Sequence, residues 1–422
     1  MSKAALFLSL GAVFALVGCD AGGGTATDRT PAPSPSPAGA LTLSAPVEQV
    51  GKMPAREPMI VEHPNGALFV TGYGAPTPHL WKSADGGATW TAVNVGTEAD
   101  GAVGNSDVDL AIAPDGTLYF IAMSYDRKAY EGTHIVIGAS RDAGATWTWT
   151  QLSKTRYDDR PWVEVTGDNT AHAIWNNGSG ISYARSADDG RTWQEQPRIH
   201  PQGHSSHMAV GPSGEIAVRI TPVSASMNVE HPGVELVAVS IDGGKTWTTH
   251  PAPGTRTFRF PYSETEDPMP RWVEPVAWDS AGHLYYLWTD PAALWLARST
   301  DRAASWTMWK LAEGGNLRYF PYLTAGGKGE LAATWFSGRG DNLRVHVARI
   351  DVSDAGTTPR VIEAPTVQPD TWEWETRPGE VRKRDTAGEY VPVMFLKDGG
   401  LAVVTTIQDL PSRGGFAFRT AR

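Results

Sequence analysis

The sequence predicts an all-β protein, a β-propeller built from four-stranded antiparallel blades, and three observations support this prediction. The chain contains 45 Gly and 31 Pro among its 422 residues, a proportion typical of many turns between short strands. Its 17 Trp supply large apolar side chains for packing between sheets. An eight-residue motif also returns at intervals of 46 to 59 residues, close to the length of one propeller blade.

Composition excludes several other classes. With 41% hydrophobic and 19% charged residues the chain is an ordinary globular one. The 36 Lys and Arg against 46 Asp and Glu give a net charge of -10 without a basic run, so we expect no nucleic-acid partner. A single cysteine excludes an intrachain disulfide and a Cys-based metal centre, and we predict neither a metal nor a cofactor.

The N-terminus has the layout of an export signal. Lys3 precedes an apolar run from Ala4 to Val17, which is short for a membrane span. Leu16-Val17-Gly18-Cys19 resembles the bacterial lipobox, which implies a signal peptide over residues 1–18 and lipidation of Cys19. The alternative is a plain signal peptide with an incidental cysteine. We expect an exported, membrane-anchored lipoprotein on the periplasmic or cell-surface side.

Two further segments follow the signal. Residues 19–40 are the lipid-anchored cysteine and a stretch of Gly, Ala, Thr, Ser and Pro, which cannot form a core and is expected to be a disordered tether. Residues 41–422 are expected to form a single propeller domain.

The repeated motif is S-x-D-x-G-x-T-W. Its Asp and Ser side chains can accept backbone N–H bonds within a hairpin turn, Gly tolerates positive φ, and Trp packs back as an apolar plug. A catalytic carboxylate is not required once per repeat, so we interpret the motif as structural. A sixth, degenerate copy surrounds Asp354. The five clear copies carry the pairs Asp85 and Trp90, Asp142 and Trp147, Asp188 and Trp193, Asp242 and Trp247, and Asp301 and Trp306.

Turn and strand patterns between the motifs predict seven blades. The last unit supplies only three strands, and Leu41 to Val50 is expected to add the fourth by pairing with Phe416 to Arg419, which closes the ring and removes exposed sheet edges. Six blades are the alternative, with about 60 residues absorbed in long loops. The seven units are expected to begin near Glu57, Asp107, Arg160, Ser206, Trp272, Tyr319 and Tyr390.

The repeats resemble the Asp-box, or BNR, repeats of the sialidase-like β-propeller superfamily. In sialidases an arginine before the first blade joins two others to clamp a substrate carboxylate. The resemblance implies this role for Arg56, which keeps the Arg-x-Pro spacing, with Arg271 and Arg318 completing the triad and Arg160 as a rival. The first blade lacks the Asp acid/base of that family before Asp85, because its acids there are Glu57 and Glu62. The tyrosine nucleophile, with a Glu helper, would be Tyr390 beside Glu389, or Tyr319.

The face opposite the motif turns is the candidate functional face, because the first strands of the blades enter the central channel there. Several carboxylates, arginines and two histidines converge on this mouth; the alternative is that these charges only pair with one another and with water. His204 and His207 are spaced to point to opposite faces of a strand, and Trp372, Trp374 and Arg377 offer an aromatic platform or simple packing. The predicted ligand-binding residues are Arg56, Glu57, Arg160, Arg271, Arg318 and Tyr319, and the catalytic candidates are Asp107, Asp159, Glu389 and Tyr390.

From the sequence we therefore expect a propeller that binds a glycan or a protein partner at the cell surface. The alternative is an exo-sialidase-like glycoside hydrolase that acts on a carboxylated glycan at the channel mouth.

Overall fold

The computed structural model describes most of the chain after residue 39. The described ranges are 40–74, 77–129, 131–178, 180–201, 203–221, 235–254, 274–290, 293–313, 318–338, 342–352, 356–369, 372–377, 380–384, 388–409 and 413–422. The signal, Cys19 and the tether lie outside them, as do Arg271, Trp272 and Asp354. Residues 40–422 form one compact unit.

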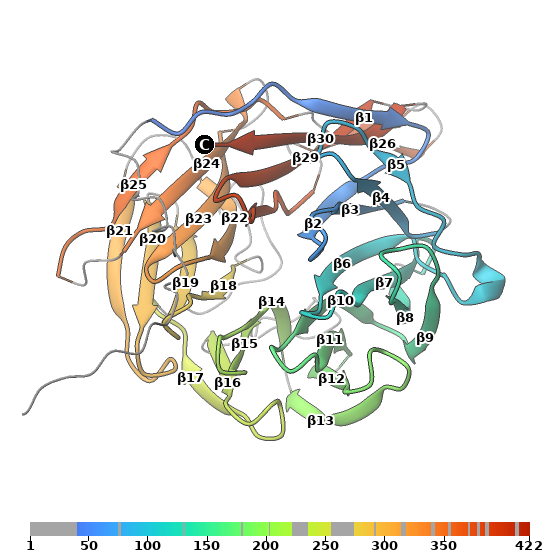
Figure 1. Ribbon diagram of the computed structural model, residues 1–422, viewed down its shortest axis with the longest axis horizontal. Coiled ribbons are helices and arrows are strands. Elements are labelled where there is room, and N and C mark those ends of the chain that lie inside the picture. The colour runs from blue at the N-terminus through green and yellow to red at the C-terminus, as the bar shows by residue number, and fades with distance from the viewer. Residues whose placement is uncertain are drawn as a thin grey trace, which may run out of the picture. The chain divides into compact units, whose positions relative to one another are not determined.

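Seven four-stranded antiparallel sheets are arranged around a common centre, so the seven-bladed propeller is confirmed (Figure 1). The predicted first strands all begin within four residues of the expected positions.

The first three blades are β2 (Arg56–Glu62), β3 (Leu68–Tyr73), β4 (His79–Ser83) and β5 (Thr91–Ala92); β6 (Ser106–Ile112), β7 (Leu118–Asp126), β8 (Glu131–Ser140) and β9 (Thr148–Ser153); and β10 (Asp158–Val165), β11 (Ala171–Asn177), β12 (Gly180–Ser186) and β13 (Gln194–His200). The next three are β14 (His204–Val210), β15 (Ile216–Thr221), β16 (Leu236–Ser240) and β17 (Thr248–Pro251); β18 (Val276–Trp278), β19 (Leu284–Asp290), β20 (Ala293–Ser299) and β21 (Thr307–Glu313); and β22 (Arg318–Ala325), β23 (Glu330–Ser337), β24 (Arg344–Asp351) and β25 (Arg360–Glu363).

The two ends of the propeller close the seventh blade. It consists of β28 (Val393–Phe395), β29 (Leu401–Asp409), β30 (Arg413–Ala421) and, at its outer edge, β1 (Val47–Gly51). Val47 pairs with Phe418 and Gln49 with Phe416, and a further bridge joins Leu43 to Ala421. This is the predicted closure, and in Figure 1 the blue β1 runs beside the red β30. A hairpin of β26 (Trp372–Arg377) and β27 (Glu380–Arg384) and a short 3-10 helix, η1 (Glu98–Asp100), complete the elements.

The repeated motifs form the hairpin turns between the third and fourth strands of the first five blades. In the first copy Ser83 Oγ accepts the Gly87 N–H at 2.8 Å, and Asp85 accepts both the N–H and the hydroxyl of Thr89, at 2.9 and 2.5 Å. The other four copies repeat these bonds. The turn therefore satisfies its own backbone, as the pattern predicted.

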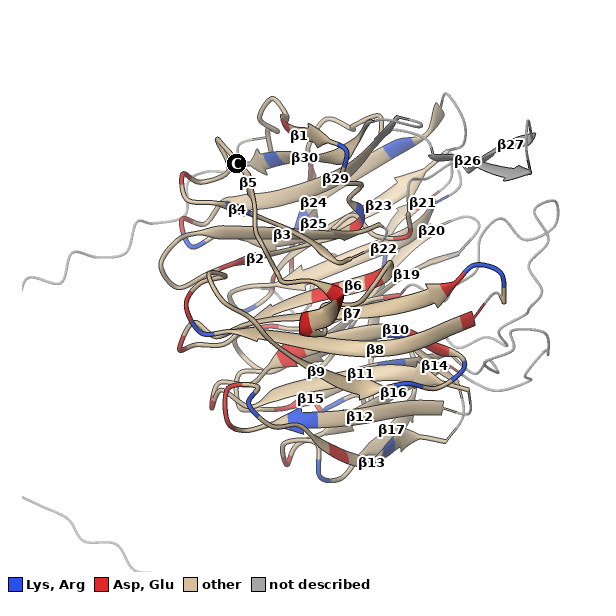
Figure 2. Ribbon diagram, turned by 90° about the vertical axis from the view of Figure 1, so that its right-hand side faces the viewer, with Lys and Arg blue, Asp and Glu red and all other residues tan. Residues whose placement is uncertain are grey.

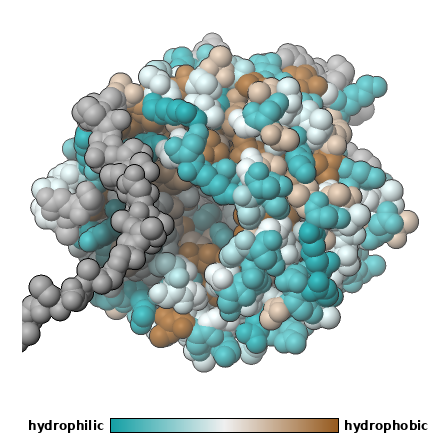
Figure 3. Space-filling model, in the orientation of Figure 1, coloured by the Kyte–Doolittle hydropathy of each residue, from teal (hydrophilic) through white to brown (hydrophobic). Residues whose placement is uncertain are grey.

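Aromatic side chains hold neighbouring blades together. Trp90, which ends the first motif, lies edge-on to Phe416 and Phe418 of the seventh blade, with ring centroids 5.1 and 5.4 Å apart. Gly87 leaves the space that Phe418 fills, because an added Cβ would lie 2.1 Å from its ring. The described exposed large hydrophobic residues are scattered, and hydrophilic residues dominate the face seen in Figure 3.

Three first strands share a strained bulge at their N-terminal ends. Glu57, Arg160 and Phe320 have φ values of 46°, 46° and 48°, and each precedes a proline. The pairing register shifts at these points in β2, β10 and β22. A non-glycine residue in this region costs about 1–3 kcal/mol and persists where its surroundings fix it. The bulges interrupt the regular alternation of side chains at the N-terminal ends of these strands.

Candidate functional site at the channel mouth

The mouth of the channel lies at the N-terminal ends of the first strands. In each blade the antiparallel order places the first-to-second and third-to-fourth turns at one face, where the motif turns lie, so the first strand begins at the other face (Figure 2). Side chains from β2, β3, β6, β10, β14 and the segment before β28 lie there. We call this group the mouth cluster: Arg56, Glu57, Tyr73, Asp107, Asp159, Arg160, His204, Glu389 and Tyr390.

Arg160 joins two blades across the mouth. Its Nη2 donates to Glu389 Oε2 at 2.7 Å and its Nη1 to Tyr390 Oη at 2.8 Å. Its Nε lies 3.8 Å from Asp159 Oδ2. The Arg160 and Glu389 side chains are only 14% and 12% exposed, so solvent screens this ion pair weakly. The sequence placed these residues 229 positions apart, and the ring brings them into contact.

Arg56 and Glu57 form the other half of the cluster. Arg56 Nη2 lies 3.6 Å from Glu57 Oε1, and the guanidinium lies over the Tyr73 ring at 5.2 Å from its centroid. Glu57 Oε1 also accepts the Glu389 backbone N–H at 3.2 Å, which connects the two halves. Tyr73 was missed by the sequence analysis; the signal for it is its place at the end of β3, where it pairs with Arg56.

Burial shifts the acids of the mouth cluster upward. Desolvation raises the pKa of Glu57 to about 8 and that of Asp159 to about 7, against the opposing attraction of Arg56 and Arg160. Burial also raises the pKa of Asp107. For Arg160, burial disfavours the charge, but Glu389, Tyr390 and Asp159 raise its pKa above the usual value. The cluster therefore contains carboxyl groups that hold protons near neutral pH beside fixed cations.

His204 is the member of the mouth cluster that comes from the fourth blade. Its Nδ1 lies 4.0 Å from Asp159 Oδ2, and burial together with Arg160 lowers its pKa to about 3. The opposite orientation of His204 and His207 was predicted from regular strand alternation, which a bulge between Ser205 and His207 interrupts. His207 lies further along the channel. No group of three His, Cys, Asp or Glu within the described residues is arranged to hold a metal ion.

The remaining predicted residues are placed as follows. Arg318 begins β22 in the sixth blade, whereas Arg271 lies outside the described residues, so the arginine triad stays a prediction. Tyr319 is 2% exposed and donates its hydroxyl to the Gly338 carbonyl at 2.9 Å, and we leave it out of the binding set proposed below. Trp372, Trp374 and Arg377 belong to β26, but their side chains lie outside the described part of the structure.

Comparison with known proteins supports the fold. YCF48 from Cyanidioschyzon merolae is 14% identical, with 90% of this chain and 98% of that chain covered and a TM-score of 0.52. The polysaccharide lyase Uly1 is 12% identical, with 88% and 90% covered and a TM-score of 0.51. A Trypanosoma rangeli sialidase mutant with trans-sialidase activity is 14% identical, with 72% and 59% covered and a TM-score of 0.42. The first two likenesses show a shared propeller fold and leave the reaction open.

No family model and no curated relative matches the chain. Within the described residues, no helix has the length and apolar character that a bilayer crossing needs.

Proposed function

We propose that the propeller binds a glycan through the mouth cluster. The observation that carries this proposal is the Arg160 network, in which one guanidinium bridges Glu389 and Tyr390 across the mouth. A buried polar network costs free energy unless every group in it has a hydrogen-bond partner. A network of this kind on strained bulges at a channel entrance is typical of a binding or catalytic site. Hydroxyl-rich ligands suit such a set, because it offers donors, acceptors and tyrosine rings together.

The charges of the mouth favour an uncharged glycan over a carboxylated one. Four acids, Glu57, Asp107, Asp159 and Glu389, face two arginines, and both arginines already lie beside a carboxyl group. An anionic sugar would have to displace Glu389 from Arg160 and would meet the remaining acids. The alternative of an exo-sialidase-like hydrolase has one specific observation in its favour. With a pKa of about 8, Glu57 is protonated at neutral pH, as a general acid requires.

A glycan array probed with the purified protein tests the proposal, followed by calorimetry with any glycan that binds. We expect neutral oligosaccharides to bind, and Arg160→Gln to weaken binding at least tenfold. Arg360→Gln changes an exposed arginine on β25 and should leave binding unchanged. Binding to no glycan, or equal binding by both variants, would refute the proposal. Release of sugar from a fluorogenic glycoside, lost in Glu57→Gln, would instead establish the hydrolase.

We also propose that the propeller is exported and anchored through lipid on Cys19. The support is the Leu16 to Cys19 pattern, in which the only cysteine of the chain stands where lipidation needs a thiol. In a bacterial host, Cys19→Ser should move the protein from the membrane fraction to the soluble one. A serine variant that stays in the membrane fraction would show that the anchor lies elsewhere.

A further inference from the structure

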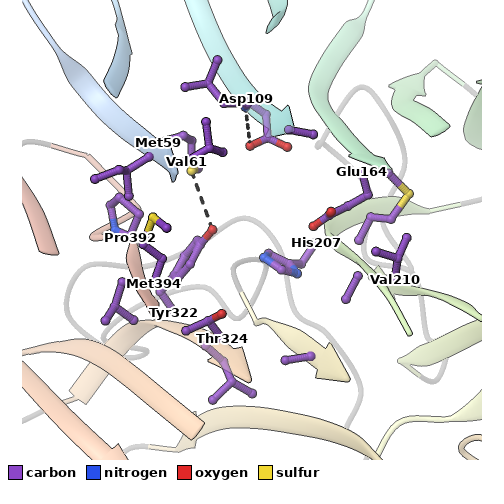
Figure 4. A pocket seen from close by; sticks show the side chains of 18 of the residues that line it. Met59, Val61, Asp109, Glu164, His207, Val210, Tyr322, Thr324, Pro392 and Met394 are labelled. Atoms are coloured by element: carbon purple, nitrogen blue, oxygen red, sulfur yellow. Dashed lines mark hydrogen bonds between the residues drawn. The ribbon is translucent and has the colours of Figure 1, made fainter. Parts of the chain in front are cut away.

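A cavity of about 390 Å³ lies among the first strands, and its described lining includes no residue of the mouth cluster. It is lined by residues from the middle to the C-terminal ends of the first strands. Figure 4 shows that Asp109 from β6, Glu164 from β10, His207 from β14 and Tyr322 from β22 all point into it. None of these residues takes part in the hydrogen bonds of the mouth cluster described above.

Two carboxyl groups face this cavity. Asp109 is 8% exposed, and its two oxygens accept the backbone N–H groups of Leu110 at 2.8 Å and Val163 at 2.9 Å. Even so, burial raises the pKa of Asp109 to about 7. Burial, and then the charge of Asp109, raise the pKa of Glu164 to about 8. Negative charge in the cavity is therefore costly as the structure stands.

His207 contributes an unsatisfied acceptor. It is 8% exposed, and its Nδ1 has no hydrogen-bond partner among the described residues. Its ring lies between those of Trp162 and Tyr322, with centroids 5.3 and 5.5 Å away. Burial lowers the pKa of His207 to about 4, so the ring is neutral at pH 7 and one of its nitrogens carries a lone pair. A buried acceptor of this kind is satisfied when a donor enters the cavity.

The lining of the cavity contains no opposing positive charge. Among its described residues there is neither Lys nor Arg, while Glu62 adds a third acid toward the motif face. The Tyr322 hydroxyl donates to Met59 Sδ at 3.8 Å, so its oxygen is left with acceptor capacity. The carboxyl groups and the His207 nitrogen thus accept hydrogen bonds and disfavour anions, whereas the indole N–H groups of Trp162 and Trp278 are donors without a partner among the described residues. The Trp162 and Tyr322 rings also attract cations.

We propose that this channel cavity binds a small organic cation that carries a protonated amine. An ammonium group donates up to three hydrogen bonds, which Glu164, Asp109 and the His207 nitrogen can accept, and its charge offsets that of the carboxylates. A divalent metal fits less well, because these groups are not arranged as a metal-binding triad among the described residues. The proposal is independent of glycan binding at the mouth.

Calorimetry with 1,4-diaminobutane tests this proposal, with 1,4-butanediol as the neutral analogue and calcium chloride as the metal probe. We expect the diamine to bind and the diol and calcium not to bind. At pH 7 binding should release protons, seen as a heat that depends on the ionisation enthalpy of the buffer, because the ammonium stabilises the ionised carboxylates. Glu164→Gln should weaken diamine binding at least tenfold.

Three variants locate the site. Glu195→Gln makes the same change of charge on the exposed strand β13 and should bind the diamine as the wild type does. Glu164→Lys places an ammonium on the cavity wall and should abolish binding. Arg160→Gln should impair the mouth and leave diamine binding intact. Equal binding of diol and diamine, binding of calcium that Glu164→Gln abolishes, loss of diamine binding in Arg160→Gln alone, or no binding at all would each overturn the proposal.

Discussion

The mouth cluster and the channel cavity share several first strands and both raise the pKa of acids, but they differ in whether a cation lies beside those acids. At the mouth, Glu389 is held 2.7 Å from Arg160, and Glu57 lies beside Arg56. In the cavity, Asp109 and Glu164 have no Lys or Arg beside them within the described lining. One channel therefore holds an entrance in which acids are paired with arginines and, in our proposal, an interior that favours cations. Side-chain position along the first strand decides which environment an acid meets.

Both regions depend on the closed ring, so opening it should affect them together and by the largest amount. Deleting residues 41–51 removes β1 and leaves the edge of β30 unpaired. We expect the melting temperature to fall by more than about 5 °C, with aggregation of the protein and loss of both ligands. Deleting residues 20–40 is the control and should change neither property. An unchanged melting temperature after loss of β1 would show that the ring does not rely on this strand.

Removing the Arg160 guanidinium from the mouth should have the next largest effect, a loss of unfolding free energy. Arg160→Met leaves the largely buried carboxyl groups of Glu389 and Asp159 without their cationic partner. Loss of one member of a buried ion pair costs about 3–5 kcal/mol of unfolding free energy. Denaturant unfolding measures this cost. Adding Glu389→Gln should recover part of it, because the uncompensated charge is then gone. A cost below about 1 kcal/mol, typical of exposed pairs, would mean that the mouth charges are screened by water.

Removing an acid from the cavity should do the reverse and stabilise the protein. The pKa of Glu164 is raised from 4.5 to about 8 in the folded state. Below pH 4.5 the residue is protonated in both folded and unfolded chains and contributes no difference. As pH rises toward 8 the unfolded chain ionises first, so the wild type loses stability that Glu164→Gln keeps.

We therefore expect Glu164→Gln to be more stable than the wild type at pH 8 by about 1–2 kcal/mol, a fraction of the full shift at about 1.36 kcal/mol per pKa unit. The gain should vanish at pH 4, which unfolding at the two pH values tests. A destabilised variant at pH 8 would show that an unseen partner already satisfies the carboxylate, and the contrast between cavity and mouth would be lost.

The sequence predicts the scaffold much better than the sites, for physical reasons. The motif turns are local, since Ser83, Asp85 and Thr89 bond within seven residues, and the pattern therefore predicts blades and their number. Closure by residues 41–50 was predicted because an unpaired edge is costly. The mouth residues Arg160, Glu389 and Tyr390 were named, but their contact depends on ring geometry across 229 residues.

Other features could not be predicted from the sequence alone. Tyr73 became visible only through its register with Arg56. The bulges at Glu57 and Arg160 each precede a proline, which alone does not specify a bulge. That Asp109 and Glu164 line one cavity depends on the assembly of the blades.

The smallest expected effect concerns an acid that lies in neither region. Asp85 is exposed in the first motif turn, where hydrogen bonds from the hydroxyl and N–H of Thr89 lower its pKa to about 2. Its folded-state pKa is lowered, whereas those of Glu57 and Glu164 are raised, so the sign of its pH dependence is opposite. Asp85 stabilises the fold above the pKa of about 3.9 that an unfolded aspartate has, and this contribution is lost as pH falls toward 2. Asp85→Asn should therefore be slightly less stable than the wild type at pH 7 and equal to it at pH 2. Solvent around the exposed carboxylate keeps this difference small.

Thermal unfolding of the two proteins from pH 7 to pH 2 measures this difference in stability. Asp115→Asn, in a turn outside the motif, is the matched control. A difference that grows on acidification would mean that the turn does not depend on the ionised carboxylate.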